Sequence, residues 1–139
     1  MASPEQTPTA VLDASALMAL LKGENGASTV ADAIEGRAGI SVANWAEVLS
    51  KAAEAGTNPQ ALAAGLREHA LIGRLLSIEP LTEGDCVVIA NLRPATKTLG
   101  LSLADRACLA LADRLGVPAL TADGGIARAD VGLDVKLIR

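Results

Sequence analysis

The sequence has almost no aromatic side chains: Trp45 is the single one among 139 residues, and phenylalanine and tyrosine are absent. Aromatic platforms, on which many proteins stack single-stranded bases, are therefore excluded. The core must instead be built from alanine, leucine, valine and isoleucine. A chain of this length is expected to form one domain that buries roughly 70% of its unfolded surface.

Positive charge is not in excess either. The 12 lysines and arginines are outnumbered by 16 aspartates and glutamates, which gives a formal net charge of −4. This balance argues against binding of nucleic acid through a broad basic surface. A protein of this composition that acts on RNA or DNA needs another source of positive charge.

Cysteines are few and long apolar runs are missing. Cys86 and Cys108 lack the spacing of metal ligands and lie in apolar helical patterns, which predicts two buried thiols. No apolar run approaches the roughly 18 residues of a membrane span, and the first eight residues, MASPEQTP, carry no apolar signal-peptide core. We therefore expect a soluble, cytoplasmic protein.

Apolar periodicity and turn residues predict alternating strands and helices after a flexible tail over 1–9, with a single domain over 10–139. The expected strands are 10–13, 39–42, 76–81, 117–123 and 134–138. The expected helices are 14–23, 27–36, 43–56, 58–76, 82–93 and 101–116, with Pro94 ending the fifth. This order predicts an α/β sandwich around a mainly parallel sheet.

Two acids follow predicted strands directly. Asp13 ends the first strand and Asp123 ends the strand over 117–123. Ligands gather at the carboxyl ends of strands in open parallel sheets. Each acid also has a simpler explanation, because Asp13 could cap a helix in competition with Ser15, and Asp123 could open an Asp-Gly turn.

A third acid, Asp105, lies in the first turn of the helix over 101–116. Its spacing from Ser102 is that of a capping box. On a helical wheel, however, Asp105 shares a stripe with Cys108 and Leu109, where an acid without a cation or hydrogen bonds would be costly.

The fourth acid, Glu47, is the most ambiguous. It has capping-box spacing from Asn44, and Lys51 lies four residues further on, where a surface ion pair could form. All four acids nonetheless come from separate segments near strand ends or helix starts. Converging carboxylates need compensation, and hard cations such as Mg²⁺ or Mn²⁺ choose carboxylate oxygens.

Four stretches resemble the motifs of PIN-domain ribonucleases, especially the VapC-type toxins of bacterial toxin–antitoxin pairs. They are VLDASAL, NWAEVL, LSLADRACLALA and LTAD, which begin at residues 11, 44, 101 and 120. The resemblance implies a three-layer α/β/α sandwich, cleavage of RNA, a homodimer, and inhibition by a VapB-like antitoxin that covers the groove. It further implies a Mg²⁺ or Mn²⁺ site made by Asp13, Glu47, Asp105 and Asp123, supported by Ser15 and Asn44.

Other interpretations stay open. A catalytically degenerate domain of the same fold could act as a binding module, and Asp13 could be the nucleophile of aspartyl-phosphate chemistry, although the position after next holds Ser15. The apolar helices over 43–76 predict a protein interface, and His69 is expected at the surface or in an interface. Candidate RNA-contacting cations, each also explained as a solvated charge, are Arg37, Lys97, Arg106 and Arg128.

Overall fold

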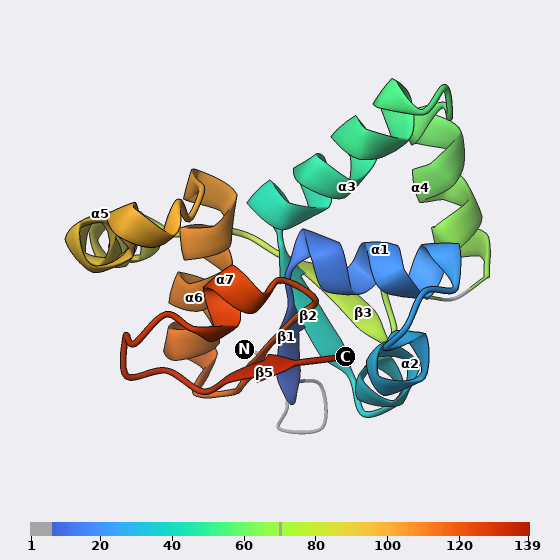
Figure 1. Cartoon of the computed structure of the whole chain (residues 1–139). Coiled ribbons are helices and arrows are strands. Elements are labelled where there is room, and N and C mark those ends of the chain that lie inside the picture. The colour runs from blue at the N-terminus through green and yellow to red at the C-terminus, as the bar shows by residue number, and fades with distance from the viewer. Residues whose placement is uncertain (1–6, 70) are drawn as a thin grey trace.

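A computed structural model describes residues 7–69 and 71–139 and shows a five-stranded sheet between two groups of helices (Figure 1). The strands are β1 (Ala10–Leu12), β2 (Ala38–Ser41), β3 (Leu76–Glu79), β4 (Ala119–Thr121) and β5 (Val135–Leu137). They lie in the order β3-β2-β1-β4-β5, and every pairing is parallel. The predicted α/β/α sandwich and its parallel sheet are therefore confirmed.

Helices cover both faces of this sheet. They are α1 (Ala14–Lys22), α2 (Ala27–Glu35), α3 (Val42–Glu54), α4 (Pro59–Glu68), α5 (Glu83–Thr96), α6 (Leu103–Leu115) and α7 (Gly124–Ala127), with a 3₁₀ turn, η2, at Lys97–Leu99. Helices α1 to α4 lie on one side and α5 to α7 on the other (Figure 1). Within the described residues, no helix is both long and apolar enough to span a membrane.

The core is aliphatic and is divided by the sheet. Side chains alternate along a strand, so neighbours on β1 face opposite layers. Leu12 packs in the cluster that contains Leu17 of α1, whereas Val11 packs with Leu109 and Leu111 of α6. This packing fixes the carboxyl end of β1 between the first turns of α1 and α6.

Two predicted helix ends are wrong. Helix α4 stops at Glu68, with His69 as its C-cap, instead of continuing to residue 76. Gly73, with a φ of 111°, then turns the chain, and Ile72 forms a bridge to Leu76. Pro94 lies inside α5 instead of ending it. Two residues of α5 and then the turn η2 follow this proline, which removes only its own N–H from the hydrogen bonding of the helix.

Three smaller features also differ from or extend the predictions. Helix α7 was not predicted, since its sequence begins with two glycines. Cys108 is buried as expected, but Cys86 is exposed in the first turns of α5, and both thiols are free. Residues 1–6 of the predicted tail lie outside the described residues, while Pro8 is buried and the Thr9 N–H donates to the Arg37 carbonyl at 2.9 Å.

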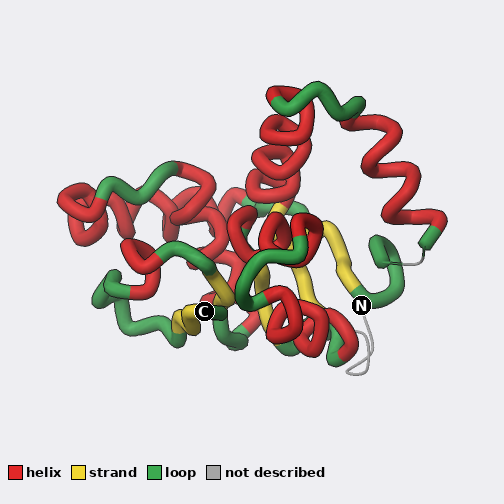
Figure 2. The backbone as a smooth tube through the Cα atoms, turned by 45° about the vertical axis from the view of Figure 1, so that its right-hand side comes forward, coloured by secondary structure: helices red, strands yellow, loops and turns green. Residues whose placement is uncertain are grey.

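Helices α3 and α4, which the sequence predicts over 43–56 and 58–76, form a helical hairpin. Both views show the two helices projecting from the rest of the domain (Figures 1 and 2). Trp45 and Val48 of α3 are buried, but no residue of α4 is. The hairpin thus has one helix in the core and one that is largely open to solvent.

Candidate functional site

Asp13 lies at the carboxyl end of β1 and caps α1. Its Oδ1 accepts hydrogen bonds from the Ala16 N–H at 2.8 Å and from the Ser15 hydroxyl at 2.7 Å. The Thr121 hydroxyl donates to the other oxygen, Oδ2. Asp13 is therefore the N-cap, as its simpler explanation predicts, and Ser15 supports its carboxylate instead of competing for the cap.

The charge of this carboxylate is poorly compensated. Asp13 is only 2% exposed. Burial raises its pKa above the ordinary value, and the hydrogen bonds from Thr121, Ala16 and Ser15 offset that rise only in part. The nearby charge of Asp105 raises the pKa further. A cation at this position would remove much of the cost of keeping Asp13 charged.

Asp105 comes from the opposite layer, in the first turn of α6. Its Oδ2 accepts the Ser102 N–H at 2.8 Å, and its own N–H donates to the Ser102 Oγ at 3.1 Å, so the predicted capping box is present. The stripe below it is buried, as the helical wheel predicts. Cys108 lies in that stripe, where burial and the charges of Asp13 and Asp105 raise the pKa of its thiol.

Asn44 holds the start of α3 against α6. Ser41, not Asn44, caps α3, and the Asn44 N–H donates to the Ser41 Oγ at 3.1 Å. The Asn44 amide Nδ2 donates to the carbonyl of Ala104 at 3.1 Å. The suggested capping box between Asn44 and Glu47 is therefore wrong, and Asn44 instead links the helix of Glu47 to the first turn that carries Asp105.

Glu47 lies one turn beyond Asn44 and is half-buried. No ion pair joins it to Lys51 in the part of the chain that the structure describes. Lys51 is exposed and lines the same pocket as Glu47. The suggested surface pair is thus not formed, which leaves the Glu47 carboxylate available within the pocket.

Asp123 caps the short helix α7 at the carboxyl end of β4. Its Oδ1 accepts the Gly125 N–H at 2.7 Å, and its own N–H donates to the Thr121 Oγ1 at 2.9 Å. The Ala122 N–H donates to the Ser15 Oγ at 2.9 Å. Thr121 and Ser15 together therefore fix the ends of β1 and β4 relative to each other.

Thr121 was not predicted from the sequence, although it is the buried hydroxyl that connects two of the acids. The only sequence feature that could have identified Thr121 is its position, two residues before Asp123 and at the end of an apolar strand. A polar side chain at the last buried position of a strand is a candidate partner for a neighbouring strand's acid.

All four predicted acids line one pocket. Its volume is 210 Å³, and its walls include Ser15 and Ser102 as well as Lys51. As the side chains are placed, however, no three acids, histidines or cysteines of the described residues are close enough together to hold a metal ion. The four acids offer only oxygen donors, which is the donor chemistry that Mg²⁺ and Mn²⁺ prefer.

A sequence model of the PIN domain matches residues 10–132. The chain belongs to the PIN domain family. The resemblance stated above is therefore confirmed over most of the domain. No curated protein is significantly similar in sequence to this PIN domain.

Solved structures share its fold. FitAcB from Neisseria gonorrhoeae is 22% identical, with a TM-score of 0.70 over 93% of this chain and 97% of that one. VapBC-1 from nontypeable Haemophilus influenzae is 17% identical, with a TM-score of 0.70 and the same two coverages, 93% and 97%. VapC20 from Mycobacterium tuberculosis, a toxin that cleaves the sarcin–ricin loop, is 17% identical, with a TM-score of 0.68 over 87% and 95%.

The predicted RNA-contacting cations are scattered over this PIN domain. The Arg106 Nη1 donates to the Ile89 carbonyl at 3.0 Å, so this arginine is packed between α5 and α6. Lys97 and Arg128 are exposed, and Arg37 lies in a different pocket. None of the four lines the pocket of the acids. His69 is exposed, and its ring contacts the Gly65 carbonyl, in keeping with a surface residue.

Proposed function

We propose that this PIN domain is a metal-dependent endoribonuclease that acts in the cytoplasm as the toxin of a toxin–antitoxin pair. One observation carries the proposal: four acids from four separate segments line a single pocket at the carboxyl ends of β1 and β4. Structures with the same fold include a toxin described as cleaving the sarcin–ricin loop and a toxin–antitoxin complex from Klebsiella pneumoniae.

Each acid keeps acceptor capacity for a cation. A carboxylate offers about four lone-pair sites. Asp13 Oδ2 accepts one hydrogen bond, and within the described residues the Oδ1 of Asp105 and the Oδ2 of Asp123 accept none. We assign Asp13 and Asp105 as direct ligands, Glu47 as a ligand or a base that positions water, and Asp123 as a ligand of a second ion or a partner through water.

The protein's part in the reaction is to place these groups. Ser15 and Thr121 hold the Asp13 carboxylate in one orientation, and Asn44 holds the helix of Glu47 against that of Asp105. A bound Mg²⁺ or Mn²⁺ would supply Lewis-acid chemistry for hydrolysis of a phosphodiester. Aspartyl-phosphate chemistry on Asp13 is not proposed, because the position after next holds Ser15 instead of a second aspartate.

A catalytically degenerate binding module is the second candidate. It is favoured by the spacing of the acids, since no three of these side chains in the described residues are close enough to hold an ion as they stand. Incubation of the purified protein with total RNA, with Mg²⁺, with Mn²⁺ or with EDTA, separates the two. The nuclease cleaves RNA only when a divalent ion is present, whereas the binding module leaves the RNA intact under all three conditions.

An antitoxin is the proposed inhibitor, and an apolar pocket beside the acids supports this partner. The pocket has a volume of 350 Å³ and includes Leu81, Ile89 and Leu103, the last 65% exposed. Leu103 follows Ser102, which lines the pocket of the acids. An apolar antitoxin segment bound at Leu103 would cover the acids, so Leu103→Asp should weaken inhibition by the antitoxin without removing the nuclease.

A homodimer is the other proposed assembly. Helix α4 buries none of its residues and exposes Ala61 and Ala64, which supports contact with a second copy. Light scattering of the purified protein should give twice the mass of one chain. Ala64→Glu should shift the protein toward the monomer, and a monomeric wild-type protein at all concentrations would contradict the proposal.

A further inference from the structure

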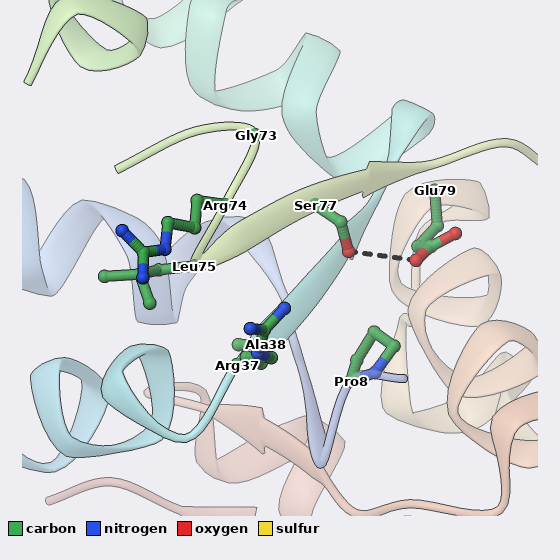
Figure 3. Close-up of a pocket in the computed structure, with 8 residues that line it drawn as sticks. All are labelled: Pro8, Arg37, Ala38, Gly73, Arg74, Leu75, Ser77 and Glu79. Atoms are coloured by element: carbon green, nitrogen blue, oxygen red, sulfur yellow. Dashed lines mark hydrogen bonds between the residues drawn. The ribbon is translucent and has the colours of Figure 1, made fainter. Parts of the chain in front are cut away.

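A second pocket lies on the part of the sheet formed by β2 and β3, and it is larger than the pocket of the acids. Its volume is 620 Å³, within the range of small-molecule sites. Arg37 directly precedes β2 and Arg74 precedes β3, while Ser77 and Glu79 lie on β3 itself. Figure 3 shows the Arg74 side chain at one end of the pocket, the Ser77–Glu79 pair at the other, and the Arg37 side chain between them.

The two arginines have no protein partner in the described part of the chain. The ion pairs there involve Arg114, Lys136 and Arg139, and the arginine side-chain hydrogen bonds come from Arg106 and Arg114. Each of these guanidinium groups offers a planar fork of N–H donors suited to phosphate, and both line the same cavity.

The backbone of Arg37 is strained. Its φ is 72°, and it is the single described residue other than glycine with a positive φ. The preceding Gly36 has a φ of −82°, so the residue best suited to the left-handed region does not occupy it. The Arg37 carbonyl accepts hydrogen bonds from the Thr9 N–H at 2.9 Å and the Thr9 hydroxyl at 3.1 Å, which holds this conformation. This left-handed residue ends α2, where the Arg37 N–H donates to the Ile34 carbonyl at 2.9 Å, and it sets the position of Arg37 beside the pocket.

The other end of the pocket accepts hydrogen bonds. The Ser77 hydroxyl donates to Glu79 Oε1 at 2.9 Å, which orients the carboxylate. Gly39 keeps the floor open, because a Cβ there would lie 3.3 Å from both Glu79 Cγ and Pro8 Cγ. Glu79 disfavours a second anion at this end and suits a hydroxyl or amino donor.

We propose that this pocket binds a nucleotide unit, with its phosphate on Arg37 and Arg74 and a sugar hydroxyl or base amino group on Glu79. The unit is either part of an RNA chain or a free nucleotide. This site is separate from the pocket of the acids, so the proposal of nucleotide binding does not depend on whether that pocket is a nuclease centre.

Amide-resolved NMR titration in EDTA, without divalent ions, tests the proposal on the intact protein. The probes are uridine 5′-monophosphate, uridine, and the trinucleotide UpUpU, whose phosphates are all internal. A phosphate-bearing probe should bind saturably and shift the amides of Gly73 and Ser77, and uridine should not. Arg74→Gln should weaken binding about tenfold or more, and Arg93→Gln, at an exposed arginine of α5, should change nothing.

Arg37→Gly separates binding from folding. Glycine adopts a φ of 72° without strain, so the variant should melt at the same or a higher temperature and yet bind about tenfold or more weakly. Binding of UpUpU alone would identify RNA as the ligand, and binding of the mononucleotide alone would identify a free nucleotide. The proposal is overturned if neither phosphate-bearing probe binds saturably, if uridine binds as tightly as they do, or if both arginine variants bind normally.

Discussion

The Thr121 hydroxyl donates a hydrogen bond to Oδ2 of Asp13, a residue 108 positions earlier in the chain. The same hydroxyl accepts the N–H of Asp123 at 2.9 Å. One buried side chain therefore orients the acid that follows β1 and fixes the backbone of the acid that follows β4. The relative placement of these two acids depends on a residue that is not itself a proposed metal ligand.

Replacement of Thr121 by valine keeps the shape of the side chain but removes this hydroxyl. The Asp123 N–H loses its acceptor and the buried Asp13 carboxylate loses a donor, so we expect the free energy of unfolding to fall by about 1–3 kcal/mol. Metal-dependent RNA cleavage should fall as well. Urea denaturation and an RNA cleavage assay measure the two effects.

Thr121→Ser is the matched control, because it restores the hydroxyl without the methyl group. It should recover most of the cleavage activity. If the valine variant cleaves RNA as well as the wild type, Thr121 does not position the acids.

Asn44→Leu removes the amide that joins α3 to α6. The Ala104 carbonyl loses the Nδ2 donor, and the buried Ser41 hydroxyl loses its amide partner. We expect a loss of about 1–3 kcal/mol in the free energy of unfolding, together with weaker Mn²⁺ binding. The readout for metal is the rise in melting temperature on addition of Mn²⁺.

Asn91→Leu, at an exposed residue of α5, serves as the control and should change neither the free energy of unfolding nor Mn²⁺ binding. Unaltered Mn²⁺ binding in a folded Asn44→Leu protein would show that the link between α3 and α6 is not needed at the site.

Asp85 gives this protein a defined sensitivity to acid. Burial alone would raise its pKa, but the Thr82 N–H and the Arg114 guanidinium, whose Nε lies 3.0 Å from Oδ1, lower the pKa below its ordinary value. The Asp85 carboxylate therefore binds a proton less readily in the folded state than in the unfolded state. Its contribution to stability is full above about pH 4 and is lost as the pH falls through the folded-state pKa.

Urea midpoints of the wild type and Asp85→Asn, measured from pH 7 down to the acid limit of folding, test this prediction. The wild type should be the more stable at neutral pH, and the difference should shrink as the pH falls below about 4. A difference that stays constant over this range would contradict the assignment.

The parts of the fold that follow from local signals could be predicted. The five segments predicted as strands each overlap one of the five strands, and Asn58 with Pro59 marked the start of α4 correctly. Gly73 and Pro94 could not be interpreted in the same way. The apolar pattern runs through the turn at Gly73, and a proline removes one backbone N–H donor without always ending a helix.

The candidate site also has parts that could be predicted from the sequence and parts that could not. Asp13, Glu47, Asp105 and Asp123 were predicted as one group, and they do line one pocket. The residues that connect them were harder to find, because the bonds from Thr121 to Asp13 and from Asn44 to Ala104 join distant parts of the chain. Arg74 was also missed, since nothing in the sequence shows that it shares a pocket with Arg37.

Asp13→Asn should remove activity without unfolding the protein. The asparagine oxygen can still accept the Ala16 N–H that caps α1, and the variant no longer buries a charge whose pKa is raised by burial. Removal of this buried charge offsets the altered hydrogen bonding, so the variant should be as stable as the wild type or more stable at pH 7. A clear loss of stability in urea denaturation would show that the carboxylate is needed for the fold.

Cleavage of RNA by this variant tests the proposed function most directly. Wild-type protein, Asp13→Asn, and Asp113→Asn at an exposed acid of α6 outside the pocket are each incubated with RNA in Mn²⁺, in Mg²⁺ and in EDTA. We predict that the wild type and Asp113→Asn cut RNA only with a divalent ion and that Asp13→Asn does not cut under any condition. Metal-dependent cleavage by Asp13→Asn equal to that of the wild type, or cleavage by the wild type in EDTA, would contradict the assignment of the four acids as a metal-dependent nuclease site.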